Sequence, residues 1–350
     1  KKKNSFLIIG SFIERKRIYE SLKAFLSAFR NDENYSLTNP EYTDKTGWII
    51  GDIKTSHTIG ILWEYQFSNI IELESIMSLG LTSCPTATHS VPVGIIETVG
   101  ESVTDFKEGD RVAYVGQFGG YGETNNVDAK ILISLPSAIP DDTVAAMMLK
   151  GMTAQYLLRQ TVSVGPKTTL LYHAAAGGVG LIACQWAKHL GARVIGTVGS
   201  DEKAELARSY GCEHVINYEK NDLTKVVMEI TDGKGVDYIC DGVGAKTYEE
   251  SIKLLKHHGT IAIFGAASGP IVPDSLAKLP PERFLVRTTL PGYTKTRDRL
   301  QASATDLFNI VQTGVVKVSI NQRYNIKDAA QAHSDLENRK TTGSTVLEFD

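Results

Sequence analysis

The sequence predicts an α/β protein built on a Rossmann-type doubly wound parallel sheet, and two observations lead to this fold class. From Met147 to about Arg287, short apolar runs alternate with amphipathic helical patterns, as in a parallel sheet with crossover helices. From Val93 to Leu135, short β-rich runs alternate with Gly and Asp turns. At 350 residues the chain exceeds the usual size of one hydrophobic core, so we expect two domains.

The first 90 residues show a different pattern. Apolar residues recur at helical spacing from Ile18 to Phe29, so an amphipathic helix is predicted over residues 16–30. The apolar run from Phe6 to Ile13 is short and interrupted by polar residues, and no small-x-small cleavage site follows it. It therefore predicts a buried strand rather than a signal peptide.

Composition argues against several classes of protein. The net charge of -3, with no long basic run, gives no electrostatic reason to expect nucleic acid or an anionic membrane as a partner. No segment approaches the roughly 20 apolar residues of a membrane span. The four cysteines are too far apart for a close-set metal site or a dense disulfide framework, so we expect isolated thiols in a reducing compartment, the cytoplasm. They are Cys84, Cys184, Cys212 and Cys240.

The stretch HAAAGGVGLIACQWAKHLGARVIGTVGS, residues 173–200, predicts a dinucleotide site. The run TTLLYH suits a buried parallel strand, and the apolar positions after Gly180 trace one face of a helix. Ala175, Gly177 and Gly180 stand where the glycines of G-x-G-x-x-G stand. Gly177 would let the backbone approach a pyrophosphate, and the helix N-terminus would offer it free N–H groups. The flanking strand and helix favour this interpretation over a plain tight turn.

The end of the next predicted strand bears on the kind of dinucleotide. An NAD site places Asp or Glu about 20 residues beyond the glycines, to hold the ribose hydroxyls. This chain has Gly199 and Ser200 there, with Lys203 in the first turn of the next helix and Tyr218 at the end of HVINY. A missing acid and a nearby cation favour the 2′-phosphate of NADP. From spacing alone, a solvated helix residue is nearly as good an explanation of Lys203.

At these residues the chain resembles the zinc-free quinone oxidoreductases of the medium-chain dehydrogenase/reductase superfamily, the zeta-crystallin-like group, and most closely their bacterial members. The likeness runs from about Gly94 to the end and includes GDRVAYVG, LKGMTAQYLLRQT, GCEHVINY, CDGVG, IAIFGAASG and DAAQAHSDLENRKTTGS. It implies a GroES-like partly open β-barrel, residues 91–149 and 288–350, joined to a Rossmann domain, residues 150–287.

The resemblance leaves residues 1–90 as an atypical N-terminal segment. The family has a Pro-Gly-x-Glu run before the glycine that matches Gly94, whereas this chain reads HSVPVG. A divergent domain, a fusion, and a frame or gene-boundary artefact each explain the mismatch. In the family this segment supplies one wall of the substrate pocket, so the mismatch concerns the substrate side and leaves the cofactor half untouched.

The resemblance implies NADPH as the cofactor, with its 2′-phosphate held by Lys203, Tyr218 and Arg339. Lys150, Gly151 and Thr153 are expected to begin the helix that leads into the Rossmann domain and to face the nicotinamide. The ends of two further strands are candidates for the same pocket, with simple turn chemistry as the alternative for their glycines. The predicted cofactor-binding residues are Lys150, Thr153, Ala176, Gly177, Gly178, Val179, Gly180, Gly199, Ser200, Lys203, Tyr218, Val243, Phe264, Gly265 and Arg339.

The sequence lacks the clustered Cys and His residues of zinc-containing relatives, so no metal ligand is assigned and the histidines are expected on the surface or packed. Without a Lewis acid, the acceptor must take hydride or electrons unaided, as a quinone does. We therefore expect a homodimeric NADPH:quinone oxidoreductase that acts on a small-molecule quinone or enone. An NADPH-dependent enoyl or alkenal double-bond reductase is the alternative within the class.

From a different class, the chain could be a catalytically impaired NADPH-binding protein, with RNA binding as in some relatives. The atypical first 90 residues favour that reading, while the near-neutral charge argues against RNA. No general acid or base is assigned. Tyr114 and Tyr121 are pocket candidates, although ordinary barrel tyrosines are the better interpretation.

Overall fold

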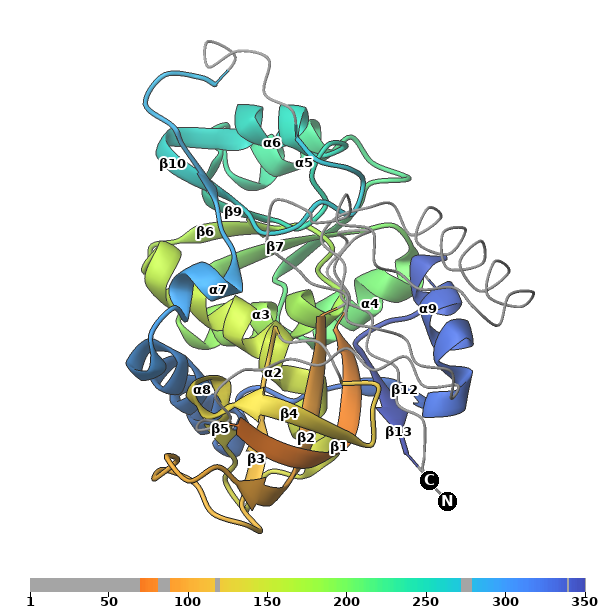
Figure 1. Cartoon of the computed structure of the whole chain (residues 1–350). Coiled ribbons are helices and arrows are strands. Elements are labelled where there is room, and N and C mark those ends of the chain that lie inside the picture. Colours follow the sequence, from red (N-terminus) through yellow and green to blue (C-terminus); the bar gives the residue numbers. More distant parts are fainter. Residues whose placement is uncertain (1–69, 81–88, 117–119, 272–278, 339, 350) are drawn as a thin grey trace, which may run out of the picture. The chain divides into compact units, whose positions relative to one another are not determined.

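The computed structural model describes residues 70–80, 89–116, 120–271, 279–338 and 340–349 (Figure 1). All of them belong to one compact unit that spans Asn69–Asp350. The strand predicted at residues 6–13, the helix predicted at residues 16–30, and the residues Cys84 and Arg339 lie outside the described residues.

Six parallel strands form the sheet that the alternating pattern predicts. Their order, read from one edge, is β8-β7-β6-β9-β10-β11. With β6 counted as the first strand, this is the 3-2-1-4-5-6 order of a Rossmann fold. The strands are apolar and largely buried because helices cover both faces of a parallel sheet. Their bounds are β6 (Thr169–Tyr172), β7 (Arg193–Val198), β8 (His214–Asn217), β9 (Val236–Asp241), β10 (Leu255–Ile263) and β11 (Phe284–Arg287).

Two hydrophobic clusters cover the two faces of this sheet. One contains side chains of α2 (Asp141–Tyr156), α3 (Gly178–His189) and α4 (Asp201–Ser209). The other contains side chains of α5 (Leu223–Ile230) and α6 (Tyr248–Leu254), which lie on the opposite side of the sheet in Figure 1. Helices and strands thus alternate along the chain. In such a sheet, ligands bind at the carboxyl ends of the strands.

The second sheet has seven strands in the order β12-β13-β1-β2-β3-β5, with β4 pairing to β1. Its pairs are antiparallel except β12 with β13. One edge of β1 is shared between β4 and β13, so the sheet divides there. The bounds are β1 (Ile70–Gly80), β2 (His89–Val99), β3 (Arg111–Ala113), β4 (Thr124–Asp128), β5 (Ile133–Ser134), β12 (Ile320–Asn325) and β13 (Ser344–Glu348).

Strand β1 and the start of β2 fall within residues 1–90, the segment that the sequence leaves as atypical. This sheet therefore takes strands from both sides of the predicted boundary at residue 90. The domain limits stay a prediction, whereas the predicted fold class, a Rossmann sheet with a GroES-like domain, is confirmed by the topology and by the solved relatives reported below.

Helix α2 links the two sheets. It begins directly after Pro140, with two acids in its first turn, and is buried from Val144 to Tyr156. It contacts α3 and α8 as well as β1, β2 and β13, which explains why its residues are buried around its whole circumference. A π-helical turn, Leu157–Thr161, extends it. The remaining helices of the described residues are α7 (Leu290–Tyr293), α8 (Arg297–Gln312) and α9 (Ala329–Glu337), with 3-10 turns at Ala129–Ile131 and Ile326–Asp328.

Two predicted elements are placed differently in the structure. The segment LKGMTAQYLL does not begin a helix, because α2 already starts at Asp141. The run VKVSI, residues 316–320, has a β-like pattern that predicts a strand, but β12 begins only at its last residue, Ile320. The first two residues of this run make their backbone hydrogen bonds outside any sheet. The N–H of Val316 donates to the carbonyl of Ile310, and the side chain of Gln185 binds both the N–H and the carbonyl of Lys317.

Candidate functional site

A cleft of about 520 Å³ lies at the carboxyl ends of β6, β7, β9 and β10. It includes the point where the strand order reverses between β6 and β9, which is where ligands bind in open α/β sheets. Its volume is in the range of small-molecule and cofactor sites. Every predicted cofactor residue lines it except Thr153, which is buried inside α2, and Arg339, which lies outside the described residues.

The glycine-rich turn occupies the middle of this cleft. After β6, the backbone of Ala174 adopts φ 55°, and the N–H of Gly177 donates to the Ala174 carbonyl at 2.9 Å. Gly177 is the N-cap of α3, and its position supplies no side-chain cap. The first N–H groups of a helix have no intrahelical partner, and together with the helix dipole they favour an anion. The strand, turn and helix therefore present the backbone that the glycine pattern predicts.

Bare backbone is required here because neighbouring groups lie very close. A Cβ at Gly180 would be 2.5 Å from the carbonyl oxygen of Ala175, which is the close helix–strand packing expected of this position. A Cβ at Gly178 would be 2.7 Å from Cδ and Cε of Lys150 and 2.8 Å from the carbonyl oxygen of Gly343. The groups that approach the backbone at Gly178 within the protein are thus a lysine stem and a glycine carbonyl.

Lys150 brings a cationic side chain to the start of α3. It lies in the second half of α2, is only 7% exposed, and lines the cleft. Burial lowers the pKa of its ammonium group to about 7. An anion bound at the N-terminus of α3 would favour the protonated form of this lysine.

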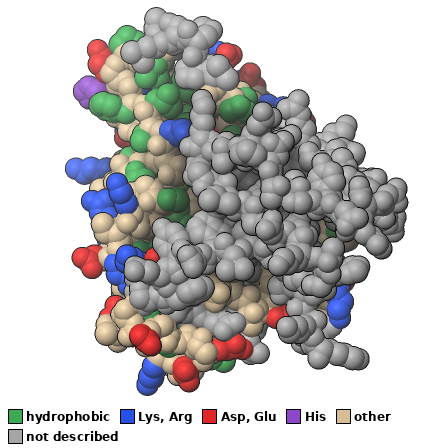
Figure 2. Space-filling view, in the orientation of Figure 1, with side chains coloured by type: hydrophobic (Ala, Val, Ile, Leu, Met, Phe, Trp, Pro, Cys, Tyr) green, Lys and Arg blue, Asp and Glu red, His purple; other side chains and the backbone are tan. Residues whose placement is uncertain are grey.

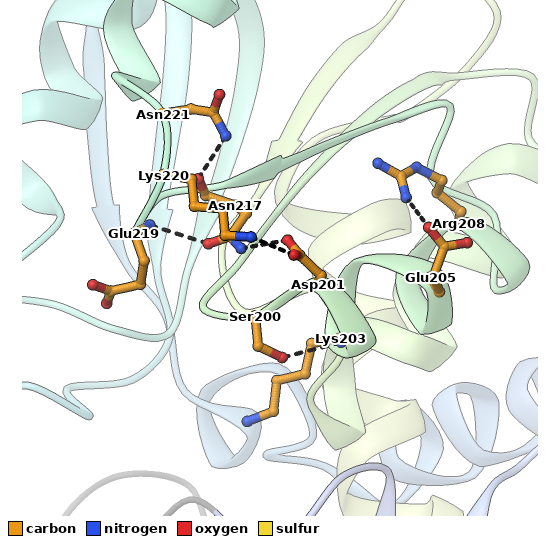
Figure 3. A network of polar contacts seen from close by, with 9 residues as sticks. All are labelled: Ser200, Asp201, Lys203, Glu205, Arg208, Asn217, Glu219, Lys220 and Asn221. Carbon is orange, nitrogen blue, oxygen red and sulfur yellow. Dashed lines mark hydrogen bonds and ion pairs between the residues drawn. The ribbon is translucent and has the colours of Figure 1, made fainter.

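Hydroxyl groups and a second lysine lie at the end of β7. The Oγ of Ser200 accepts a hydrogen bond from the N–H of Lys203 and so caps α4. The hydroxyl of Tyr218 lies against Gly199, where a Cβ would be only 2.7 Å from it. Figure 3 shows the ammonium end of Lys203 on the opposite side of Ser200 from the carboxylate of Asp201. This end of the cleft offers hydroxyls and a cation where an NAD site has an acid.

The opposite wall is formed where β9 and β10 end. The buried carboxylate of Asp241 accepts hydrogen bonds from the N–H groups of Val243 (2.7 Å) and Gly244 (3.0 Å) and from the hydroxyl of Thr247 (2.7 Å). These bonds fix the turn that carries Val243 into the cleft. The ring of Phe264 packs against Gly242, so this part of the cleft is apolar.

Four candidate residues lie away from the cleft. A Cβ at Gly151 would be 2.4 Å from Cδ1 of Leu307, so this glycine serves the packing of α2 on α8. The hydroxyl of Thr153 donates to the carbonyl of Leu149 within α2. Tyr114 is buried in the core of the second sheet, and Tyr121 contacts His333 through its hydroxyl. The two tyrosines match the interpretation as ordinary barrel residues, whereas Gly151 and Thr153 were expected at the nicotinamide.

The structure adds residues that sequence reasoning did not assign to the site. Thr341, Thr342, Gly343 and Thr345 line the cleft, and Gly343 forms an isolated β-bridge with Gly177. Thr341, Thr342 and Gly343 belong to the stretch KTTGS, residues 340–344, whose likeness to the family is their only signal in the sequence; Thr345 follows directly after it.

His173, at the end of β6, also lines the cleft. Its two ring nitrogens contact the hydroxyls of Thr197 (3.0 Å) and Ser251 (2.8 Å), and burial lowers its pKa. It is thus a packed histidine, as expected for the histidines of this chain.

The described residues contain no group of three or more His, Cys, Asp or Glu side chains placed to hold a metal ion. In the same part of the chain, Cys184, Cys212 and Cys240 are buried free thiols. No helix among the described elements has the length and apolar character needed to cross a membrane.

Comparison with known proteins agrees with this geometry. Residues 178–304 match the family model described as zinc-binding dehydrogenase. A quinone oxidoreductase of Pseudomonas aeruginosa is 46% identical over 266 residues, which cover 75% of this chain and 82% of that protein. A 2-haloacrylate reductase of a Burkholderia species is 42% identical over 259 residues, 72% of this chain and 78% of that protein.

A solved structure shares the fold. The quinone oxidoreductase of Escherichia coli in complex with NADPH superposes with a TM-score of 0.75 at 39% identity, covering 80% of this chain and 92% of that chain. The sequence identity, the coverage and the shared fold confirm the family that the motifs predicted. The chain belongs to the quinone oxidoreductases of the medium-chain dehydrogenase/reductase superfamily.

Proposed function

We propose that this chain is an NADPH:quinone oxidoreductase, which passes a hydride from NADPH to a small quinone. The observation that carries the proposal is the single cleft that joins the glycine-rich start of α3 to the group Ser200, Lys203 and Tyr218. The names of the similar proteins, which include a quinone oxidoreductase solved with NADPH, support the same assignment.

The residues of the cleft fit this cofactor. The bare backbone at Gly177 and Gly178 and the ammonium group of Lys150 would hold the pyrophosphate, because both favour an anion. Ser200, Lys203 and Tyr218 would hold the 2′-phosphate through hydroxyls and a charge-assisted hydrogen bond. The apolar wall at Val243 and Phe264 would receive the nicotinamide.

When bound, NADPH supplies the hydride; the protein's contribution is orientation. The turn held by Asp241 and the ring of Phe264 fix one wall of the cleft, so a flat ring bound against them has few orientations. The same apolar side chains limit the access of water to the transfer. Lys150 was expected to face the nicotinamide. Because its stem lies beside Gly178 at the start of α3, we infer a role at the pyrophosphate instead.

A second candidate function is reduction of an activated carbon–carbon double bond. The similarity to a 2-haloacrylate reductase at 42% identity favours it, because that protein's name specifies a substrate with such a bond. An enone and a quinone both present a conjugated acceptor, so one apolar cleft beside the nicotinamide could serve either.

Steady-state oxidation of NADPH with a panel of acceptors tests both functions. The panel should contain 1,4-benzoquinone, a naphthoquinone, 2-chloroacrylate and a simple alkenal. We expect saturable turnover with at least one quinone, at a rate that survives dialysis against a chelator. Turnover with 2-chloroacrylate or the alkenal alone would favour the second function. Tight NADPH binding without turnover of any acceptor would indicate that the chain is a catalytically impaired NADPH-binding protein.

For the assembly, we infer a homodimer joined along the edge of the six-stranded sheet. Among the described residues, β11 pairs only with β10, and its Phe284 and Leu285 are 56% and 37% exposed. Figure 2 shows hydrophobic side chains gathered in the upper part of the described surface, where Figure 1 has β10 and α6. An open strand edge with apolar side chains is suited to pairing with a second copy.

The buried free thiols Cys184, Cys212 and Cys240 support a reducing location, the cytoplasm.

A further inference from the structure

Two acids stand directly beside the residues proposed to hold the 2′-phosphate. Asp201 and Glu202 occupy the first turn of α4, between Ser200 and Lys203. A carboxylate turned into the cleft here would repel a phosphate, and in this fold an acid in this region holds the ribose hydroxyls of NAD. The orientation of Asp201 therefore bears directly on which dinucleotide the cleft prefers.

The structure holds the carboxylate of Asp201 on the far side of α4's first turn. Its Oδ1 accepts a hydrogen bond from Nδ2 of Asn217 at 2.8 Å, and its Oδ2 pairs with Nζ of Lys220. Figure 3 shows these partners on one side of Asp201 and the side chain of Lys203 on the other. The hydrogen bond from Lys220, followed by that from Asn217, lowers the pKa of Asp201, so this acid stays charged and paired.

Asn217 gives this arrangement a fixed anchor. It is the last residue of β8, it is only 6% exposed, and its Oδ1 accepts from the N–H of Glu219 at 3.1 Å. Its carbonyl accepts from the N–H groups of Lys220 and Asn221. With its amide oxygen used in the turn, its Nδ2 faces Asp201. An exposed ion pair alone contributes little free energy. Here the carboxylate of Asp201 is also held by the buried side-chain amide of Asn217.

We propose that Asn217 and Lys220 are positioning residues for cofactor choice: they hold Asp201 out of the cleft and offset its charge. Lys203, Ser200 and Tyr218 then meet a 2′-phosphate with the carboxylate of Asp201 turned away. Two other acids stay near, because the carboxylate of Glu202 hydrogen-bonds to Ser200 and Glu219 lines the cleft. This inference rests on the proposed use of NADPH and adds the residues that set its preference over NADH.

The test compares the dissociation constants of NADPH and NADH in the full chain and in three variants. Lys220→Met should reduce the preference for NADPH by about three- to tenfold, mainly through weaker NADPH binding, because Asp201 is then unpaired near the phosphate. The loss should be largest at low salt. Removing the acid as well, in Asp201→Asn with Lys220→Met, should restore the preference.

Arg208→Met is the matched control. Arg208 lies on α4, the helix of Asp201, and carries the same charge as Lys220, but its hydrogen-bonded partner is Glu205. Its loss should leave the preference close to that of the native chain. A preference that falls equally in Arg208→Met and Lys220→Met would show a general charge effect and overturn the inference.

Three further results would contradict it. If the native chain prefers NADPH and Lys220→Met keeps that preference, the positioning role is wrong while the proposed function stands. If the double variant stays as weak as Lys220→Met, Lys220 acts by its own charge rather than through Asp201. Equal affinities for the two dinucleotides in the native chain would overturn the proposed function, and the inference with it.

Discussion

The stem of Lys150 lies directly against Gly178, the first residue of α3, and the carbonyl of Gly343 approaches the same glycine from another element. A Cβ added at Gly178 would be 2.7 Å from the lysine stem and 2.8 Å from that backbone oxygen. The lysine can move aside, but the backbone carbonyl belongs to the segment bridged to Gly177. Three elements therefore meet at a point where only glycine fits.

Gly178→Ala should displace the segment at Gly343 from the cleft. We expect NADPH binding to weaken by about tenfold or more, with a loss of unfolding free energy of about 1–3 kcal/mol from overpacking. Fluorescence titration and chemical denaturation measure the two effects. Gly165→Ala is the control, because the space around a Cβ there is open. Native-like binding in Gly178→Ala would show that the contact at Gly343 has no bearing on the cofactor.

Burial of Lys150 predicts a pH-dependent stability. Its pKa is about 7 in the folded protein and near its ordinary value of 10.5 when unfolded, so the unfolded chain holds the extra proton between these pH values. This lysine therefore costs the most stability below about pH 7, and the cost disappears as the pH rises toward 10.5.

Lys150→Met removes that cost. The variant should exceed the native chain in unfolding free energy at pH 6, on the order of several kcal/mol, and the difference should shrink steadily toward pH 10. Chemical denaturation at a series of pH values measures it, and NADPH binding should weaken in the same variant. A stability difference that does not change with pH would mean that Lys150 keeps its ordinary pKa.

The hydroxyl of Tyr172 predicts a gain in stability on its removal. Among the described residues it has no hydrogen-bond partner, although the side chain is almost fully buried. Tyr172→Phe should therefore stabilise the protein by about 1 kcal/mol, because an unsatisfied buried hydroxyl bears an uncompensated desolvation cost. Thermal or chemical unfolding measures the gain.

Tyr238→Phe is the control for that prediction. The hydroxyl of Tyr238 donates to the carbonyl of Leu157 at 3.0 Å, so its loss should destabilise the protein. NADPH binding in Tyr172→Phe should stay within about threefold of the native value. Tyr172 lines the cleft, so a large loss of affinity would show instead that its hydroxyl bonds to the cofactor.

The exposed edge of β11 predicts the effect of a charge on assembly. Phe284→Asp places a carboxylate at the strand proposed to pair with a second copy, so light scattering should report a shift from dimer to monomer. NADPH affinity should not change, because Phe284 does not line the cleft. A native chain that is monomeric, or a variant that remains a dimer, would rule out this edge as the interface.

The sequence allowed the centre of the site to be predicted because its signals are local. A strand, a glycine-rich turn and a helix follow one another within residues 168–189, and the structure has β6, the turn and α3 there. Lys203 and Tyr218 were placed by their positions after the next two strands, and both line the cleft. Strand ends of a parallel sheet meet at one edge, so order along the chain is enough to bring these residues together.

The contacts that sequence could not supply are between distant segments. Gly343 and Gly177 are neighbours only because the last segment of the chain returns to the cleft. The start of α2 was missed because a helix buried on all sides has no amphipathic face to mark it. Gly151 packs on Leu307 of a later helix, and this distant contact cannot be read from the sequence. The sequence therefore did not distinguish it from a glycine that contacts the cofactor.

The preference of the cleft for NADPH over NADH is measured by the dissociation constants of the two dinucleotides for the native chain, determined by fluorescence titration under one set of conditions. Ser200, Lys203 and Tyr218 at the end of the cleft predict that NADPH binds at least about tenfold more tightly, a difference of about 1.4 kcal/mol. One charge-assisted hydrogen bond to the 2′-phosphate can supply this. Equal dissociation constants would show that Ser200, Lys203 and Tyr218 do not recognise the 2′-phosphate, which is the group that distinguishes the two cofactors.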